Sequence, residues 1–159
     1  MNLIASVADI LPFSCEQVLE TMFFTGVLSA EERRLTPDSS CQHCTVTAKV
    51  VFNGPPEGAL EIRLENSTAA ALASSFLGID PEAVTDGDCR QVAGELANMI
   101  CGSVLSRMAP ESTLHLESPV VDNGSDTLSP GGPVGYPMAA HYFLTLPEGG
   151  LEVSMGAVS

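Results

Sequence analysis

The chain has 159 residues, 45% of them hydrophobic, and a formal net charge of −14 from 6 basic and 20 acidic residues. This length and hydrophobic content predict a single globular domain spanning residues 1–159 with a sizeable core. The acidic excess argues against nucleic acid and against an anionic membrane surface as partners, because both are bound through Lys and Arg.

The compartment is predicted from two features of the sequence. No apolar run reaches the ~20 residues that a membrane helix needs. A secretory signal begins with positive charge, and this chain carries no Lys or Arg before Arg33. We therefore expect a cytoplasmic protein whose five cysteines are reduced thiols.

The sequence Cys41-Gln42-His43-Cys44 raises the possibility of a metal or redox site. A structural zinc site needs four ligands, and no second Cys/His pair has suitable spacing. A thioredoxin-type motif opens a helix after a strand, whereas this one precedes a predicted strand. We favour cysteines in a loop and predict no metal site.

The first predicted element is a helix that ends near Phe24, because apolar residues recur there at helical spacing. Pro12 is expected to end or kink any helix that starts earlier. Ser14 and Gln17 resemble a capping box at which the helix could restart. Residues 25–43 are predicted to be a polar connection.

Strands are predicted where apolar and polar residues alternate. They are expected at 45–52, 59–65, 113–117, 140–146 and 150–155. The first two form a hairpin around the turn-rich Asn-Gly-Pro-Pro-Glu-Gly sequence. His115 and His141 fall at polar positions of the alternation, so we expect them at the surface. Residues 121–137 are rich in Gly, Pro, Ser and Asp and predict an exposed loop.

Two further helices are predicted between the hairpin and the third strand. The first spans residues 67–77, with Asn66 or Ser67 as its N-cap, and the second follows Asp86 as its cap. The order of helix, hairpin, two helices and three strands predicts an α+β fold. Its sheet is mainly antiparallel, and long helices pack on one face.

Residues 91–108 are the most informative stretch of the chain, because on a helix they separate into two faces. The broad apolar face consists of Val92, Ala93, Leu96, Ala97, Ile100, Val104 and Met108. The narrow opposite stripe consists of Gln91, Glu95, Asn98, Gly102 and Ser106, with Gly94 at its edge.

The composition of this stripe is unusual for a solvated helix surface. Glycine in a helix interior costs about 1 kcal/mol relative to Ala, so Gly94 and Gly102 indicate that another backbone comes close here. Glu95 and Asn98 lie three residues apart and therefore side by side. The alternative is that these two residues belong to an ordinary exposed face.

Residues 94–102 and the segments around them resemble a known protein family. The sequence Gly-Glu-Leu-Ala-Asn-Met-Ile-Cys-Gly at 94–102 resembles the Glu-x-x-Asn helix signature of the CheC/CheX/FliY chemotaxis phosphatases. Segments 18–25, 59–78 and 114–121 resemble the elements that flank this signature in the family. A single such site and one short domain resemble the CheX-like branch. Two features depart from the family pattern: Gln91, where Asp or Ser is common, and Pro119, about two residues early.

The resemblance implies a substrate, the aspartyl phosphate of a CheY-type receiver domain. It implies that Asn98 orients the attacking water and that Glu95 contacts the receiver, with Gln91, Gly94 and Gly102 in the partner-binding surface. Mg²⁺ is then held by the receiver, and this chain binds no cofactor of its own. The resemblance also implies a homodimer formed through sheet edges.

Two other functions remain open at this stage. The chain could be a CheX-like module that binds a receiver, or another CheX-like chain, without hydrolysing anything; Gln91 and the shifted Pro119 favour this alternative. A structural subunit of the flagellar switch, as in FliY-like proteins, is a weaker alternative because such chains usually carry additional domains.

Overall fold

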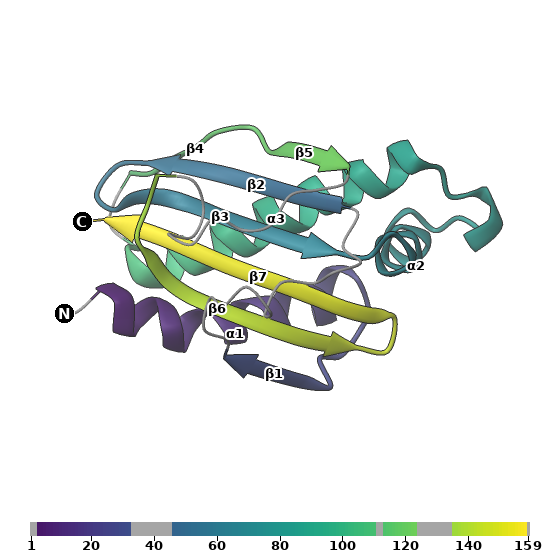
Figure 1. The fold of residues 1–159 in the computed structure, drawn as a ribbon, viewed down its shortest axis with the longest axis horizontal. Coiled ribbons are helices and arrows are strands. Elements are labelled where there is room, and N and C mark those ends of the chain that lie inside the picture. Colours follow the sequence, from purple (N-terminus) through teal and green to yellow (C-terminus); the bar gives the residue numbers. More distant parts are fainter. Residues whose placement is uncertain (1–2, 33–45, 111–112, 124–134, 159) are drawn as a thin grey trace.

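The computed structural model describes residues 3–32, 46–110, 113–123 and 135–158. Along these ranges, one helix is followed by three strands, two α-helices separated by a 3₁₀ turn, and four more strands (Figure 1). In chain order the elements are α1 (Leu3–Met22), β1 (Ser29–Glu32), β2 (Val46–Asn53), β3 (Glu57–Leu64), α2 (Asn66–Leu77), the short 3₁₀ helix η1 (Pro81–Ala83), α3 (Asp86–Met108), β4 (His115–Leu116), β5 (Val120–Asn123), β6 (Met138–Leu146) and β7 (Gly149–Val158).

The described strands form one seven-stranded sheet in which every pairing is antiparallel. Its order is β1-β6-β7-β3-β2-β4, and β5 also pairs with β2. The hairpin β2–β3 and the hairpin β6–β7 meet where β3 pairs with β7, for example at Leu60 and Met155. Segments far apart in the sequence therefore share the centre of the sheet.

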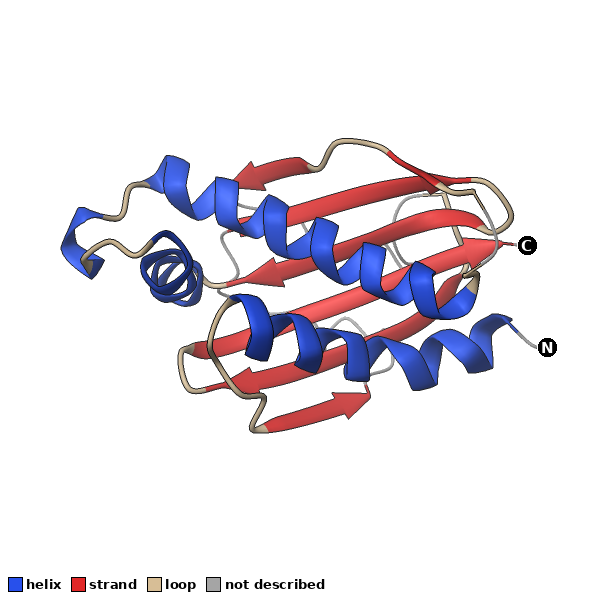
Figure 2. Cartoon of the chain, turned by 180° about the vertical axis from the view of Figure 1, so that it is seen from behind, coloured by secondary structure: helices blue, strands red, loops and turns tan. Residues whose placement is uncertain are grey.

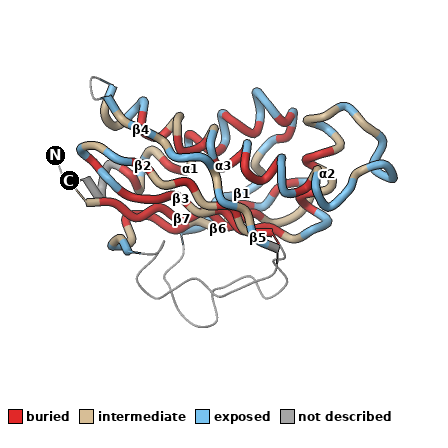
Figure 3. Tube along the Cα trace, turned by 90° about the horizontal axis from the view of Figure 1, so that it is seen from above, coloured by how far each residue is buried: buried red, intermediate tan, exposed pale blue. Residues whose placement is uncertain are grey.

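All three α-helices cover the same face of this sheet. Figure 2 shows α1 and α3 side by side across the face, with α2 seen end-on near the beginning of α3. The view from above shows these helices on one side of the strands (Figure 3). The predicted α+β fold, with an antiparallel sheet and helices on one face, is confirmed.

The core lies between the helices and the sheet. Strand β2 shows why, because its buried residues alternate with less buried ones, as a sheet with one covered face requires. The largest fully buried side chains are Phe23, Phe52, Leu11, Leu19, Leu60, Ile62, Leu64, Leu72, Leu96, Ile100, Leu144 and Leu151.

Two short strands differ from the sequence prediction. Strand β1 lies within the segment predicted as a polar connection, and β5 overlaps the predicted exposed loop. All four residues of β1 are exposed, so no apolar alternation marks the strand. Backbone pairing with β6 defines β1, and backbone pairing with β2 defines β5.

The predicted helix caps at Ser14 and at the start of α2 are wrong. Helix α1 runs unbroken through Pro12, and Ser14 is buried inside it instead of capping a new helix. Proline removes one helical hydrogen bond, and burial of Leu11 and Cys15 on either side holds the helix together. In α2 the N-cap position is Glu65, which makes no side-chain cap hydrogen bond.

His141 corrects a further expectation. It lies on the sheet face away from the helices, as the alternation predicts, but it is only 2% exposed. Its Nε2 lies 3.0 Å from Oε1 of Glu152, which is 1% exposed. A buried polar side chain needs such a partner, so this residue is part of the structure and not of the surface. His115 is exposed, as expected.

Candidate active site on helix α3

Helix α3 carries the candidate residues, and its first turn is fixed by a capping box. Thr85 Oγ1 accepts a hydrogen bond of 3.1 Å from the Asp88 backbone N–H. The Thr85 N–H donates in return to Asp88 Oδ2 at 2.9 Å. Thr85 is therefore the N-cap in place of the predicted Asp86, and the reciprocal bonds satisfy two otherwise free donors. The helix that presents the site begins at a well-defined residue.

The apolar face of α3 is buried as the periodicity predicts. Val92, Leu96, Ile100 and Val104 are at most 1% exposed. Burying one such side chain contributes roughly 1.5–3 kcal/mol. This contact fixes the rotation of α3 about its axis, so the orientation of the opposite face is set by the core.

The polar stripe faces solvent. Gln91, Glu95, Asn98 and Ser106 are exposed, and Gly102 is half-buried. The side chains of Glu95 and Asn98 form no hydrogen bond with any other described residue. Side chains three residues apart on a helix have Cβ atoms about 5–6 Å apart, so a carboxylate and an amide stand side by side and free to contact a partner.

Gly94 has a different environment from the one expected of a partner-binding residue. It is buried, and a Cβ atom added there would lie 3.3 Å from Val121 Cγ2 and 3.4 Å from Pro119 Cβ. The segment that approaches this glycine is the chain's own, leading into β5, and it does so through the side chains of Pro119 and Val121. Gly94 therefore lets residues 119–121 pack against α3 beside Glu95, and its assignment to the partner-binding surface stays a prediction.

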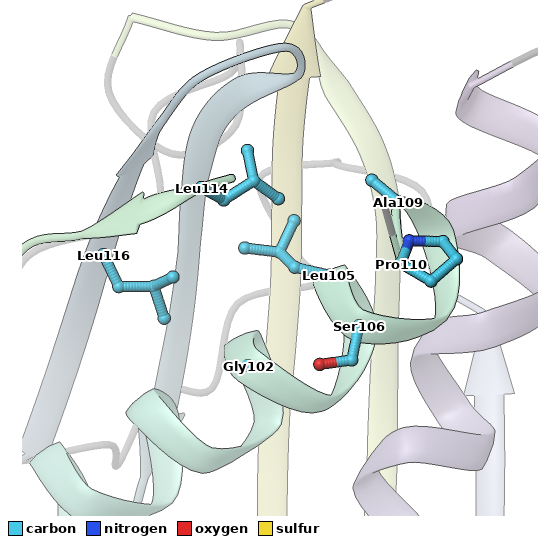
Figure 4. Close-up of a pocket in the computed structure, with 7 residues that line it drawn as sticks. All are labelled: Gly102, Leu105, Ser106, Ala109, Pro110, Leu114 and Leu116. Carbon is cyan, nitrogen blue, oxygen red and sulfur yellow. The ribbon is translucent and has the colours of Figure 1, made fainter. Parts of the chain in front are cut away.

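The space beside the Gly102 Cα atom, by contrast, is empty of other parts of the described fold. A Cβ atom added there would have no atom of the rest of the molecule within 4 Å. It lines a groove of about 410 Å³ between the C-terminal part of α3 and the strand β4 (Figure 4). The other lining residues are Leu105, Ser106, Ala109, Pro110, Leu114 and Leu116. Nothing in the described fold requires a glycine at position 102.

Sequence reasoning missed the residues that border the stripe. Pro119 and Val121 pack against α3, and Leu114 and Leu116 form one wall of the groove. Pro119 and Val121 lie 25 and 27 residues after Gly94, the part of α3 that they border. The sequence contained one signal, the unusual position of Pro119, but it does not show what this proline contacts.

Among the described residues no group of three or more His, Cys, Asp or Glu side chains could hold a metal ion. Cys41, His43 and Cys44 lie outside the described residues. No helix in the described part of the chain is long and apolar enough to span a membrane.

Comparison with protein families decides the affiliation. The model of the chemotaxis phosphatase CheX matches residues 46–132, which is more than half of the chain and includes the whole of α3. The chain belongs to the CheX family. No curated protein sequence matches it.

Solved structures agree on the fold of this CheX-family chain. A CheC-like superfamily protein from Shewanella sp. PV-4 is 19% identical, with full coverage of both chains and a TM-score of 0.78. The chemotaxis protein CheX from Vibrio vulnificus is 17% identical, covers 99% of this chain and 100% of its own, and has a TM-score of 0.76. A CheX–CheY–BeF₃–Mg²⁺ complex from Borrelia burgdorferi matches at 16% identity, with coverages of 95% and 97% and a TM-score of 0.70. These likenesses extend over nearly the whole chain.

Proposed function

We propose that this CheX-family chain is a phosphatase that hydrolyses the aspartyl phosphate of a CheY-type receiver domain in the cytoplasm and so ends a chemotaxis signal. The observation that carries the proposal is the exposed pair Glu95 and Asn98 on a capped helix whose other face is locked into the core. The Borrelia burgdorferi CheX structure contains CheY, which supports a receiver as the partner.

The proposed reaction requires little covalent chemistry from the enzyme. A water oxygen forms a bond to phosphorus while the bond from phosphorus to the aspartyl oxygen breaks. The receiver recovers its aspartate carboxylate, inorganic phosphate leaves, and the proton lost by the water ends on phosphate or solvent. Phosphoryl transfer of this kind depends mainly on positioning and electrostatics.

Asn98 suits the task of positioning the water. Its amide oxygen accepts a hydrogen bond from the attacking water, and its nitrogen donates to another group. No described residue competes for either atom. The amide therefore becomes fully engaged only when the receiver's phosphorylated pocket is placed over α3.

Glu95 lies one helical turn from Asn98 and supplies a negative charge to the interface. A carboxylate at this position can accept hydrogen bonds from a lysine of the receiver and so fix the register of Asn98 over the phosphorus. The family resemblance assigns Mg²⁺ to the receiver, and the Borrelia burgdorferi complex contains Mg²⁺ together with CheY.

The test is a phosphate-release time course on phosphorylated CheY-type receivers from the same organism, with and without this chain. Acceleration by the wild-type protein is expected, and Asn98→Ala should lower that acceleration about 100-fold or more, the scale of losing one positioned group. Asn66→Ala is the matched control, because Asn66 is also an exposed helical asparagine but lies on α2.

Three outcomes separate the alternatives. Loss of acceleration in Asn98→Ala but not in Asn66→Ala supports the proposal. Stoichiometric binding of a receiver without acceleration by the wild-type chain supports the non-catalytic module instead. Full activity of Asn98→Ala removes the role assigned to this amide.

A further inference from the structure

We propose that the groove at the C-terminal end of α3 receives an apolar side chain of the same receiver domain and thereby selects which receivers the chain accepts. The proposal rests on the proposed function, because it places the receiver on the stripe that contains Asn98. It assigns a binding role to residues outside the Glu-x-x-Asn signature.

The groove is continuous with the stripe. Gly102 and Ser106 belong to the polar stripe of α3 and also line the groove. Residues 98, 102 and 106 follow one another at four-residue spacing, so they lie along nearly the same line on the helix surface. The surface that presents Asn98 therefore leads directly into the groove.

A receiver interface of typical size, centred on Asn98, is large enough to include the groove. Ser106 lies eight residues beyond Asn98, or about 12 Å along the helix at 1.5 Å per residue. A standard interface buries about 800 Å² on each partner, and a round patch of that area extends about 16 Å from its centre. A receiver centred over Asn98 therefore covers the groove.

The chemistry of the groove indicates what enters it. Leu105, Leu114 and Leu116 point their side chains around the hollow from α3 and from the β4 side, with Ala109 and Pro110 at the far end (Figure 4). No charged side chain is among its described lining residues. A groove of about 410 Å³ with such walls accommodates an apolar side chain.

Gly102 supplies an independent argument. A glycine in a helix interior costs stability relative to alanine, and a side chain at position 102 would meet nothing in the described fold. Gly94 is different, because Pro119 and Val121 occupy the space above it. The unexplained glycine is the one at the mouth of the groove, where an incoming chain would have to approach the helix backbone.

The first experiment fills the groove. In Ser106→Phe the new ring occupies the space between α3 and β4, and Ser106 is exposed, so the fold should be retained. The KM for phosphorylated receiver is expected to rise about 10-fold, while the rate at saturation stays within about twofold, as for loss of a single interface anchor. Equilibrium binding to the receiver activated with BeF₃⁻ and Mg²⁺ should weaken by the same factor.

The matched control is Ser75→Phe, the same substitution at an exposed position of α2. Helix α2 lies near the beginning of α3 (Figure 2). The groove is lined by residues from the C-terminal part of α3. The control should bind the receiver as the wild type does. Equal weakening by both variants, or unchanged binding by Ser106→Phe in an active protein, overturns the groove assignment and leaves the proposed function intact. A wild-type protein that neither binds nor dephosphorylates any receiver overturns the proposed function first.

A double-mutant cycle identifies the occupant. Each exposed apolar residue of the receiver within about 16 Å of its phosphorylated aspartate, the radius of a standard interface patch, is changed to Ala. One of these changes should weaken binding to the wild-type chain and have no further effect on Ser106→Phe, which gives a coupling between the two sites. Additive effects at every such position would show that nothing enters the groove.

Discussion

Gly94 on α3 lies against Pro119, so that a methyl group added at Gly94 would come 3.4 Å from Pro119 Cβ. Gly94 directly precedes Glu95, and the segment that packs against this glycine therefore forms a wall beside the candidate catalytic pair. The two glycines of the stripe thus have different causes. A side chain at position 94 would press on Pro119 and Val121, whereas one at position 102 would meet no other part of the described fold.

This difference predicts unequal changes in stability from the same substitution at the two positions. Gly102→Ala should raise the free energy of unfolding by about 1 kcal/mol, because alanine is the better helix former and its Cβ meets nothing. Gly94→Ala should gain clearly less, because its Cβ would lie 3.3 Å from Val121 Cγ2 and the wall must shift. Urea unfolding of the two variants and the wild type measures both values. Equal stabilisation would show that the segment after Pro119 does not press on α3.

Much of α3 could be predicted from the sequence, because a helix that packs on a sheet obeys a local period. The buried positions of Val92, Leu96 and Ile100 and the exposure of Glu95 and Asn98 all follow from 3.6 residues per turn. The fold class followed from the order of elements. The roles of the two catalytic candidates came from the family resemblance, and no structural observation here tests them.

What could not be predicted depends on contacts between distant segments. Pairing of β1 with β6 involves four exposed residues without an apolar pattern. The wall at Pro119 and the groove beside Leu114 depend on how the chain after α3 returns along β2. Burial of His141 likewise depends on its neighbour Glu152 in the adjacent strand. The local periodicity of apolar residues carries no information about such contacts between distant segments.

The thiols of Cys15 and Cys101 should be unreactive in the folded protein. Burial raises the pKa of the Cys15 thiol to about 12, and it raises the pKa of the Cys101 thiol to about 12. At about pH 8 only roughly one in 10⁴ of either thiol is then thiolate, the reactive form. Iodoacetamide should label neither residue without denaturant and both in its presence, as read by peptide mass spectrometry. Rapid labelling of Cys101 in the folded state would mean that α3 is not packed as described.

Glu61 should reduce stability at neutral pH. Burial raises the pKa of this carboxyl above its usual value, and Glu152 adds to the rise, while Arg63 and Lys49 oppose it. Between the ordinary and the raised pKa the folded state holds a proton that the unfolded state has lost, so stability falls as the pH rises through this window. Glu61→Gln removes this fall.

The test of Glu61 is a pair of unfolding curves at two pH values. Glu61→Gln should be more stable than the wild type at pH 7, because the neutral amide avoids the cost of burying a charge. Below pH 4.5, the ordinary pKa of the group, the carboxyl is largely protonated in both states and the two proteins should converge. A variant less stable than the wild type at pH 7 would show that attraction to Arg63 and Lys49 outweighs burial.

The family resemblance predicts a homodimer, and the structure offers two sheet edges for it. Strand β1 forms one edge, and β4 and β5 lie at the other, beside the groove and the Pro119 wall. Pairing through β1 leaves both candidate sites of a dimer open to receivers. We therefore expect the β1 edge to be used, because an exposed edge strand pairs readily with another chain.

Two exposed apolar residues distinguish the edges. Leu28, next to β1, is 67% exposed, and Val120, in β5, is 64% exposed. Sedimentation equilibrium should find a dimer for the wild type, a weakened dimer for Leu28→Asp and an unchanged dimer for Val120→Asp. The reverse result would place the interface at the β5 edge, where a second copy would compete with the receiver for the surface beside α3. A monomer at high concentration would exclude pairing at either edge.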